Sequence, residues 1–219
     1  MIYNMTVEVK ICGLDRPETV DGAVNAGAEM LGFVFYPPSP SNLTASAASH
    51  LTNRVPAGVK RVGLFVDPTD EMITTVLNQN ALDLIQLHGN ESPERVAELK
   101  DITSLKVIKV LKVTDIRDLK YVSIYQGVAE WLMFDALAPK DMKRALPGGN
   151  ALSFDWNILA RANIPTPWIL AGGLNLKNVK EAMNTSGAKV VDVSSGVEKQ
   201  PGVKCVEKIQ SFIQAVKEA

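Results

Sequence analysis

Eight short apolar runs recur along the chain, and they constrain its fold more than any other feature of the sequence. Most of them lack the polar and apolar alternation of a sheet with one face in water. Continuous apolar strands are what a parallel sheet covered on both faces requires. The predicted strands are residues 7–12, 30–36, 60–66, 83–87, 105–110, 131–135, 168–171 and 189–194.

Segments with helical spacing separate these runs. The clearest is the last, where Val206, Ile209, Phe212 and Ile213 recur at the i, i+3, i+4 interval of a helix with one buried face. The weakest is residues 44–53. Five polar residues are predicted to begin helices: Thr69, Ser92, Thr114, Asp155 and Asn175.

Eight strands that alternate with eight helices in 219 residues are typical of one closed fold. We therefore predict an α/β protein, a single (β/α)8 TIM barrel domain over residues 1–219. An open doubly wound sheet uses the same alternation, usually with fewer units, and is the alternative.

Composition excludes several other classes of protein. Hydrophobic residues make up 46% and charged residues 21%, enough apolar residues to fill a core. The net charge is −1 and no long Lys or Arg run occurs, so we expect no nucleic-acid partner. We predict neither a secretory signal at residues 1–6 nor a membrane span. Two cysteines are too few for a disulfide framework, so the expected location is cytoplasmic.

The turns after the seventh and eighth predicted strands are the candidate phosphate site. Reactive groups in a barrel lie where strands end, and barrels commonly hold phosphate at these two turns. Glycine lets the backbone approach an anion closely, and N–H groups at a helix start favour negative charge. The alternative is that the glycines only form tight turns. The candidates are Gly172, Gly173, Ser194, Ser195 and Gly196.

Cys12 and Asp135 end the first and sixth predicted strands and are the candidate catalytic pair. A proton-transfer role for Cys12 requires a thiolate, hence a depressed pKa, which Lys10 favours if it points into the same mouth. A carboxylic acid in a water-poor pocket has a raised pKa and donates protons near neutral pH. The structural alternatives are a buried apolar cysteine and a loop-capping aspartate.

Other polar residues have simpler interpretations. His88, at the end of the fourth strand, is either an acid–base group or a hydrogen-bonded wall of the pocket, and we favour the wall. His50 is expected on the surface, and three tryptophans are expected to pack between helices and barrel. Three carboxylates, Asp67, Asp83 and Asp192, lie on separate strands without metal-ligand spacing, so no metal site is predicted.

At these residues the chain resembles the phosphoribosylanthranilate isomerase family over nearly its whole length. Each matching stretch is modest alone, but their order and spacing together are specific. The stretches are residues 10–13, 32–36 with 39–40, 86–89, 154–156, 170–174 with 178–179, and 191–198 with 201–202.

The resemblance implies an Amadori rearrangement of N-(5'-phosphoribosyl)anthranilate to 1-(2-carboxyphenylamino)-1-deoxyribulose 5-phosphate in tryptophan biosynthesis. Asp135 is then the acid that opens the furanose ring, and Cys12 the base that removes the proton from C2. The reaction is redox-neutral, so we expect no cofactor or metal. The residues implied in substrate binding are His88, Asp192, Ser41, Gly149 and Asn150, with phosphate on Gly172, Gly173, Ser194, Ser195 and Gly196.

Three residues depart from the family pattern. Ser41 stands where the family has an Arg expected near the anthranilate carboxylate, a loss of roughly 1.5–3 kcal/mol in substrate interaction. Asn42 and Lys60 are candidates to compensate. Ala151 stands where glycine is common and is strained if that position has positive φ. Cys205 replaces a common Asp at the start of the last helix, a loss of about 0.3–1 kcal/mol.

Two other functions compete with the isomerase. One is a different phosphosugar isomerase, epimerase or synthase on the same scaffold, which the pairing of Cys12 with Asp135 argues against. The other is a catalytically weakened or binding-only barrel, which Ser41 and Ala151 favour. The expected partner in each case is a small phosphorylated molecule, and the sequence leaves open whether the chain is a monomer or a homodimer.

Overall fold

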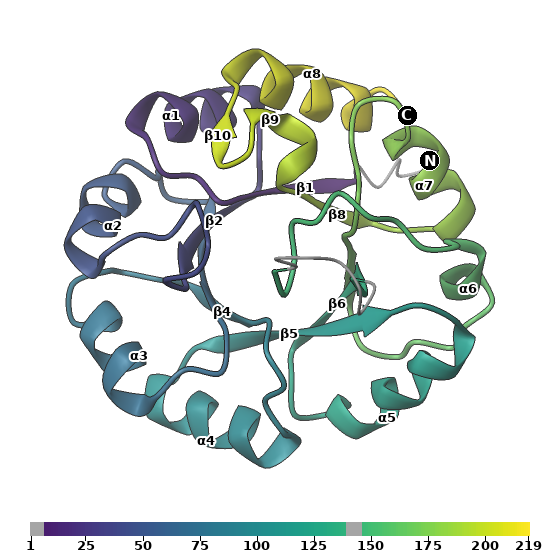
Figure 1. Ribbon diagram of the computed structural model, residues 1–219, viewed down its shortest axis with the longest axis horizontal. Coiled ribbons are helices and arrows are strands. Elements are labelled where there is room, and N and C mark those ends of the chain that lie inside the picture. Colours follow the sequence, from purple (N-terminus) through teal and green to yellow (C-terminus); the bar gives the residue numbers. More distant parts are fainter. Residues whose placement is uncertain (1–6, 139–145) are drawn as a thin grey trace.

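The computed structural model describes residues 7–138 and 146–219, and within them eight parallel strands close into a barrel with the helices outside (Figure 1). This confirms the predicted TIM barrel. The absence of a secretory signal was predicted from residues 1–6, which lie outside the described residues. The strands are β1 Glu8–Cys12, β2 Met30–Phe35, β3 Lys60–Phe65, β4 Leu84–Leu87, β5 Lys106–Val113, β6 Trp131–Ala136, β7 Trp168–Leu170 and β8 Val190–Val193.

The helices follow the strands around the outside of the barrel (Figure 1). The weakly predicted helix between the second and third strands is present as α2. The helices are α1 Pro17–Ala26, α2 Ala45–Thr52, α3 Asp70–Leu77, α4 Pro93–Thr103, the 3-10 helix η1 Ile116–Tyr121, α5 Val122–Tyr125, α6 Asn157–Ala160, α7 Val179–Ser186, the 3-10 turn η2 Ser195–Val197 and α8 Val206–Lys217.

Side-chain caps explain where several of these helices begin. The Thr69 hydroxyl accepts a hydrogen bond from the N–H of Met72, and Ser92 caps α4 in the same way, as predicted. Three predicted caps are wrong. Trp156 rather than Asp155 stands at the start of α6. Asp115 rather than Thr114 begins η1, because its carboxylate accepts from Arg117 N. Asn178 rather than Asn175 precedes α7, because Asn175 instead forms a turn that accepts from Lys177 N.

The interior of the barrel has an apolar lower part and a polar upper mouth. Inward-facing side chains near the amino ends of the strands form a closed apolar cluster that includes Met30, Val62, Ile108 and Met133. Lys10 on β1 is in register with both Asp192 on β8 and Met30 of this cluster, and the pocket residues lie at the carboxyl ends of the strands. The barrel is therefore filled below and lined with polar groups above, where the βα loops begin.

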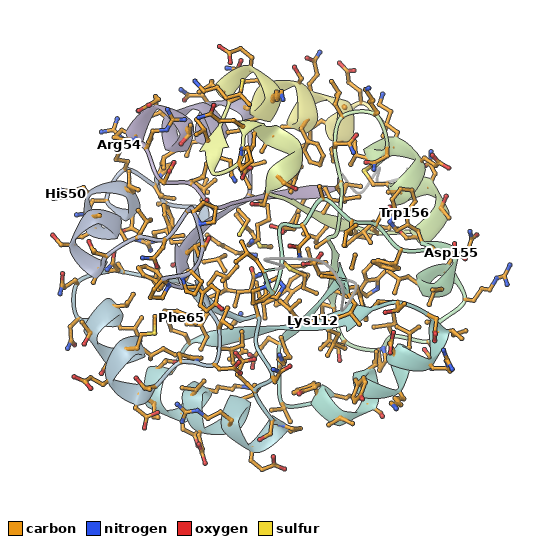
Figure 2. All side chains as sticks on the ribbon, in the orientation of Figure 1. His50, Arg54, Phe65, Lys112, Asp155 and Trp156 are labelled. Atoms are coloured by element: carbon orange, nitrogen blue, oxygen red, sulfur yellow. The ribbon has the colours of Figure 1, made fainter. Side chains whose placement is uncertain are left out.

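A second and larger apolar cluster lies between the strands and the surrounding helices. Trp168 contacts Phe134 edge to face, and Trp156 packs against the same cluster, as predicted (Figure 2). Trp131 differs, because it packs against the cluster inside the barrel, beside Lys60. His50 lies on the outer rim (Figure 2). Among the described residues, no helix combines the length and apolar character needed to cross a membrane.

A short antiparallel hairpin in the loop after β8 was not predicted. Its strands, β9 Glu198–Gln200 and β10 Val203–Lys204, are too short to produce a periodic pattern. The hairpin places Lys204 beside the barrel mouth, where its amino group donates to Ser194 Oγ at 3.1 Å and Glu198 Oε1 at 2.5 Å. The loop thus adds a buried lysine, paired with the partly buried Glu198, to the rim of the site.

Candidate active site

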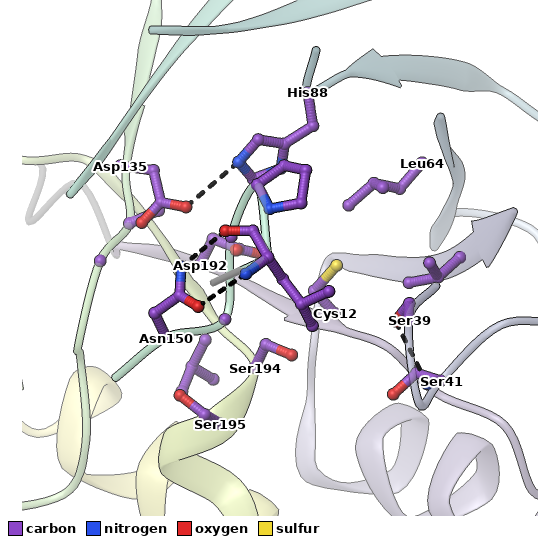
Figure 3. A pocket seen from close by; sticks show the side chains of 18 of the residues that line it. Cys12, Ser39, Ser41, Leu64, His88, Asp135, Asn150, Asp192, Ser194 and Ser195 are labelled. Carbon is purple, nitrogen blue, oxygen red and sulfur yellow. Dashed lines mark hydrogen bonds and ion pairs between the residues drawn. The ribbon is translucent and has the colours of Figure 1, made fainter. Parts of the chain in front are cut away.

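One pocket occupies the mouth of the barrel, at the carboxyl ends of the strands (Figure 3). It contains every predicted site residue except Gly196: Cys12, Ser41, His88, Asp135, Gly149, Asn150, Gly172, Gly173, Asp192, Ser194 and Ser195. Gly196 instead packs against the preceding loop, since a Cβ there would lie 2.0 Å from the Leu174 carbonyl oxygen. The structure places these residues together, and their individual roles remain predictions.

Cys12 lies at the base of the pocket, at the end of β1 (Figure 3). Gly32 on the neighbouring strand leaves room for it, because a Cβ at Gly32 would lie 2.8 Å from Cys12 Sγ and 3.1 Å from Lys10 Nζ. The side chains of Lys10 and Cys12 therefore converge over Gly32. Lys10 is completely buried and donates to Asp192 Oδ1 at 2.6 Å. The expected inward orientation of Lys10 is present.

Burial and charge oppose each other at this thiol. Burial raises the pKa of Cys12 above its usual value, whereas the Lys10 ammonium group acts to lower it. The depressed pKa expected for a thiolate base is therefore not found without substrate. Burial also disfavours the charged form of Lys10, but Asp192 and Cys12 outweigh this and hold its pKa above the usual value. Lys10 is thus a fixed cation beside the sulfur.

Asp135 lies across the pocket on β6, in contact with His88 (Figure 3). Its Oδ2 is 3.2 Å from His88 Nε2, and its Oδ1 accepts from Ala136 N at 2.9 Å. On the other side of the ring, Gln86 Nε2 donates to His88 Nδ1 at 3.3 Å. An amide NH2 group only donates, so in this orientation the ring proton lies on Nε2, facing Asp135. His88 thus lines the pocket between Gln86 and Asp135, and the choice between an acid–base group and the hydrogen-bonded wall that we favour stays a prediction.

The loop after β6 covers this acid. Gly148 approaches closely, because a Cβ there would lie 2.4 Å from His88 Cε1 and 2.8 Å from Asp135 Oδ2. Asn150 closes the loop on itself, as its amide both accepts from Leu146 N and donates to Leu146 O (Figure 3). Ala151 has φ +56°, the left-handed region that glycine adopts more readily. The strain anticipated at Ala151 is therefore present.

The two predicted phosphate turns meet at one side of the pocket. Gly172 and Gly173 both have positive φ, and they follow β7 after Ala171. The carbonyl oxygen of Gly173 accepts from the side-chain amides of Asn175 and Asn178. Neither asparagine lines the pocket, so this carbonyl is held away from it. Such an arrangement suits an anion, which N–H groups attract and carbonyl oxygens repel.

Ser41 is buried at the opposite side of the pocket, where its N–H donates to Ser39 Oγ (Figure 3). A Cβ on Gly13 would lie 3.2 Å from Ser41 Oγ and 3.1 Å from Lys204 Nζ, so both groups flank Gly13. Neither residue suggested for compensation fits the site. Lys60 begins β3 at the far end of the barrel, and Asn42 is exposed.

Sequence reasoning missed two buried polar residues beside the site. Gln86 precedes His88 by two residues, and period two on a strand places both side chains on the same face. That spacing was available in the sequence. Lys204 reaches the mouth only through the hairpin fold, so no local signal identified it. Within the described residues, no group of three or more potential metal ligands occurs.

The comparisons with known proteins agree with this geometry. The family model of N-(5'-phosphoribosyl)anthranilate isomerase matches residues 9–215. The chain belongs to this family. A family isomerase of Paramagnetospirillum magneticum is 51% identical, over 97% of this chain and 98% of its own length. One from Parvibaculum lavamentivorans is 47% identical, over 98% of this chain and its full length.

Solved structures of the family share the barrel. The isomerase of Thermotoga maritima superposes with a TM-score of 0.85 at 33% identity, over 97% of this chain and all of its own. A second isomerase structure, with TM-score 0.84 and 32% identity over the same shares, holds reduced 1-(o-carboxyphenylamino)-1-deoxyribulose 5-phosphate. Both likenesses cover the strands and loops that build the pocket described here.

Proposed function

We propose that this pocket isomerises N-(5'-phosphoribosyl)anthranilate by acid–base catalysis, with Asp135 as the acid and Cys12 as the base. The chain is an isomerase of the tryptophan-biosynthesis family. The observation that carries the residue assignment is the placement of these two groups, on β1 and β6, in one pocket. Each has a polar side chain beside it that can influence its protonation: Lys10 lies beside Cys12, and His88 lies beside Asp135.

The proposed reaction begins at the furanose ring. Protonated Asp135 donates its proton to the ring oxygen, the bond from C1 to that oxygen breaks, and the nitrogen lone pair forms an iminium ion. The Cys12 thiolate then removes the C2 proton, and the released electron pair forms an enolamine. Proton transfer from the C2 hydroxyl to C1 yields the ketone. Oxidation state is conserved within the molecule, so the proposal invokes no cofactor.

Lys10 supports the proposed base through its charge. Its ammonium group stabilises a thiolate on Cys12, because the two groups lie together in a water-poor interior. Asp192 shares that charge, since it accepts from Lys10 and also lines the pocket. We infer that Asp192 holds a substrate hydroxyl, while its charge acts to raise the pKa of Cys12 and that of Lys10 acts to lower it.

Substrate binding is proposed for two opposite sides of the pocket. The phosphate is assigned to Gly172, Gly173, Ser194 and Ser195, with Gly196 holding the turn behind them. The related isomerase structure contains a product analogue with a 5-phosphate, which supports a phosphorylated ligand for this pocket. The anthranilate end is assigned to the side lined by Ser41, and Gly149 and Asn150, in the loop after β6, are proposed to bind the substrate as well. The cytoplasmic location and the monomeric or homodimeric state remain predictions.

The test is steady-state turnover of phosphoribosylanthranilate, generated in the assay and followed by loss of its fluorescence. We expect saturable turnover with a high KM, because Ser41 offers the substrate carboxylate no charge. Cys12→Ala and Asp135→Asn should each abolish turnover, since each removes a proton-transfer group while keeping the side-chain volume similar. Circular dichroism should show both variants folded.

Two results would contradict this proposal. One is near-parent activity in either variant. The other is a folded parent that binds the reduced product analogue without any turnover, which would favour a binding-only barrel.

A further inference from the structure

A buried ion pair behind the turn that carries His88 is not used by the proposed reaction. Lys109 on β5 is 2% exposed and Glu91 is 4% exposed, and Lys109 Nζ lies 2.8 Å from Glu91 Oε2. Lys109 alternates with the inward-facing Ile108 and Val110, so it lies on the outer face of the sheet. Burying two charges is costly unless both are hydrogen-bonded, so their partners indicate what the pair does.

Those partners are the peptide groups on either side of His88. Lys109 Nζ donates to the carbonyl oxygen of Gly89 at 2.9 Å and to that of Leu87 at 3.4 Å. Glu91 Oε1 accepts from the N–H of Gly89 at 3.0 Å. Both backbone groups of Gly89 and the carbonyl before His88 are thus bonded to one ion pair. The N–H of His88 itself donates to Phe65 O.

The neighbouring turn is held by the same carboxylate. Asp67 N donates to Glu91 Oε1 at 2.8 Å, and Asp67 Oδ1 accepts from Asn90 N at 2.7 Å. Asp67 has φ +44°, a strained conformation for a residue with a side chain. Its carboxylate packs directly over Gly89, where a Cβ would lie 2.3 Å from Oδ1. Strain of this kind persists only where surrounding contacts fix it.

Charge keeps this cluster together. Burial acts to raise the pKa of Glu91, but Lys109 and the N–H donors outweigh it, and the pKa lies below its usual value. Tyr125 adds a contact from outside, because its hydroxyl donates to Glu91 O and its ring lies beneath the Lys109 ammonium group.

We propose that Glu91 and Lys109 are positioning residues that fix the backbone of His88, and through it the orientation of Asp135. His88 is the link, because its Nε2 faces Asp135 Oδ2 at 3.2 Å. This inference deepens the proposed function and depends on Asp135 being the acid. A displacement of about 1 Å in a reacting group lowers a rate by roughly a hundredfold, so a rigid support for His88 has catalytic value.

The kinetic test uses the double variant E91Q/K109M. It removes both charges but keeps an acceptor for the Gly89 and Asp67 N–H groups, so we expect it to fold, as judged by circular dichroism and urea unfolding. We expect kcat to fall roughly tenfold or more, with KM within about twofold of the parent. In a His88→Ala background the same double substitution should cause little further loss, because its effect passes through His88.

The control removes an ion pair from the opposite end of β4. Arg61 on β3 pairs with Asp83 before β4, far from the pocket. The variant R61M/D83N should leave kcat and KM at parent values. A folded E91Q/K109M protein with parent kcat would overturn the proposal, and so would a loss fully additive with that of His88→Ala.

A second readout is independent of activity. The chain has only two histidines, and His50→Gln leaves His88 alone in a ¹⁵N-histidine NMR spectrum. We expect one fixed tautomer with the proton on Nε2 in the H50Q protein, and a mixture once E91Q/K109M is added. An unchanged tautomer would overturn the positioning role. A parent without turnover would instead overturn the proposed function, while the spectrum would still decide this inference.

Discussion

At the scale of single residues, several side chains of the site have surroundings that impose conflicting requirements on their charge or conformation. Burial raises the pKa of Cys12, whereas Lys10 lowers it. One ring nitrogen of His88 faces Asp135, and the other accepts a hydrogen bond from the Gln86 side chain. Ala151 keeps a backbone angle that favours glycine. Perturbed pKa values and strained backbone angles are typical of functional sites, where the side chains serve activity rather than stability.

The raised pKa of Cys12 predicts the pH at which its thiolate forms. Burial outweighs the effect of the Lys10 ammonium group, so the thiolate should form at a pH above the usual thiol pKa. Thiolate absorbance in a Cys205→Ser protein measures this, because Cys12 is then the one remaining cysteine. The ratio of thiolate to thiol should rise about tenfold per pH unit. A midpoint below the usual thiol pKa would contradict the burial described here.

At the scale of elements, short polar residues decide where helices start. Thr69 and Ser92 accept from backbone N–H groups of α3 and α4. Cys205 holds the same place before α8 but makes no side-chain cap bond, and its sulfur contacts Glu207 instead. The family's common Asp would place a second negative charge beside Glu207 here. The last helix is therefore stabilised by its apolar face rather than by its cap.

A better cap should stabilise α8. Cys205→Ser keeps the side-chain size and supplies an oxygen that accepts from the first helical turn, so we expect a gain of about 1 kcal/mol in the free energy of unfolding. The melting temperature should rise by about 2–4 °C. Ser92→Ala is the opposite control and should lose about 1 kcal/mol. Equal stability of Cys205→Ser and parent, alongside a destabilised Ser92→Ala, would show that α8 does not depend on its cap.

At the scale of the whole molecule, the barrel separates stability from chemistry. Apolar side chains fill the interior below, and polar groups meet at the mouth above. Because β8 pairs with β1, the first and last units of the chain complete the same ring. Substitutions in the lower interior should therefore change stability, and substitutions at the mouth should change activity.

A cavity in the lower interior should lower stability without altering the reaction. Ile108 is fully buried in the interior cluster, and Ile108→Ala should lower the free energy of unfolding by about 2–5 kcal/mol. Urea unfolding measures this, and kcat of the folded variant should remain near the parent value. Ile102 is 43% exposed on α4, so Ile102→Ala should cost no more than about 0.5 kcal/mol. Equal losses in both variants would contradict the interior packing described here.

The sequence by itself determined the barrel and which two residues to propose as its base and acid. Apolar runs predict strands buried on both faces, and the ends of those runs pointed to Cys12 and Asp135 because reactive groups in a barrel follow its strands. Period two on β1 also predicted that Lys10 shares the face of Cys12. These inferences are local, since each depends on residues a few positions apart.

Only the tertiary structure decided which distant groups touch. The contact of His88 with Asp135, the approach of Lys204 to the rim, and the ion pair of Glu91 with Lys109 join segments from different loops or strands. Barrel closure sets these distances, and no periodic pattern encodes them. The direction of the Cys12 pKa shift follows for the same reason, because burial and charge are properties of the assembled interior rather than of β1 alone.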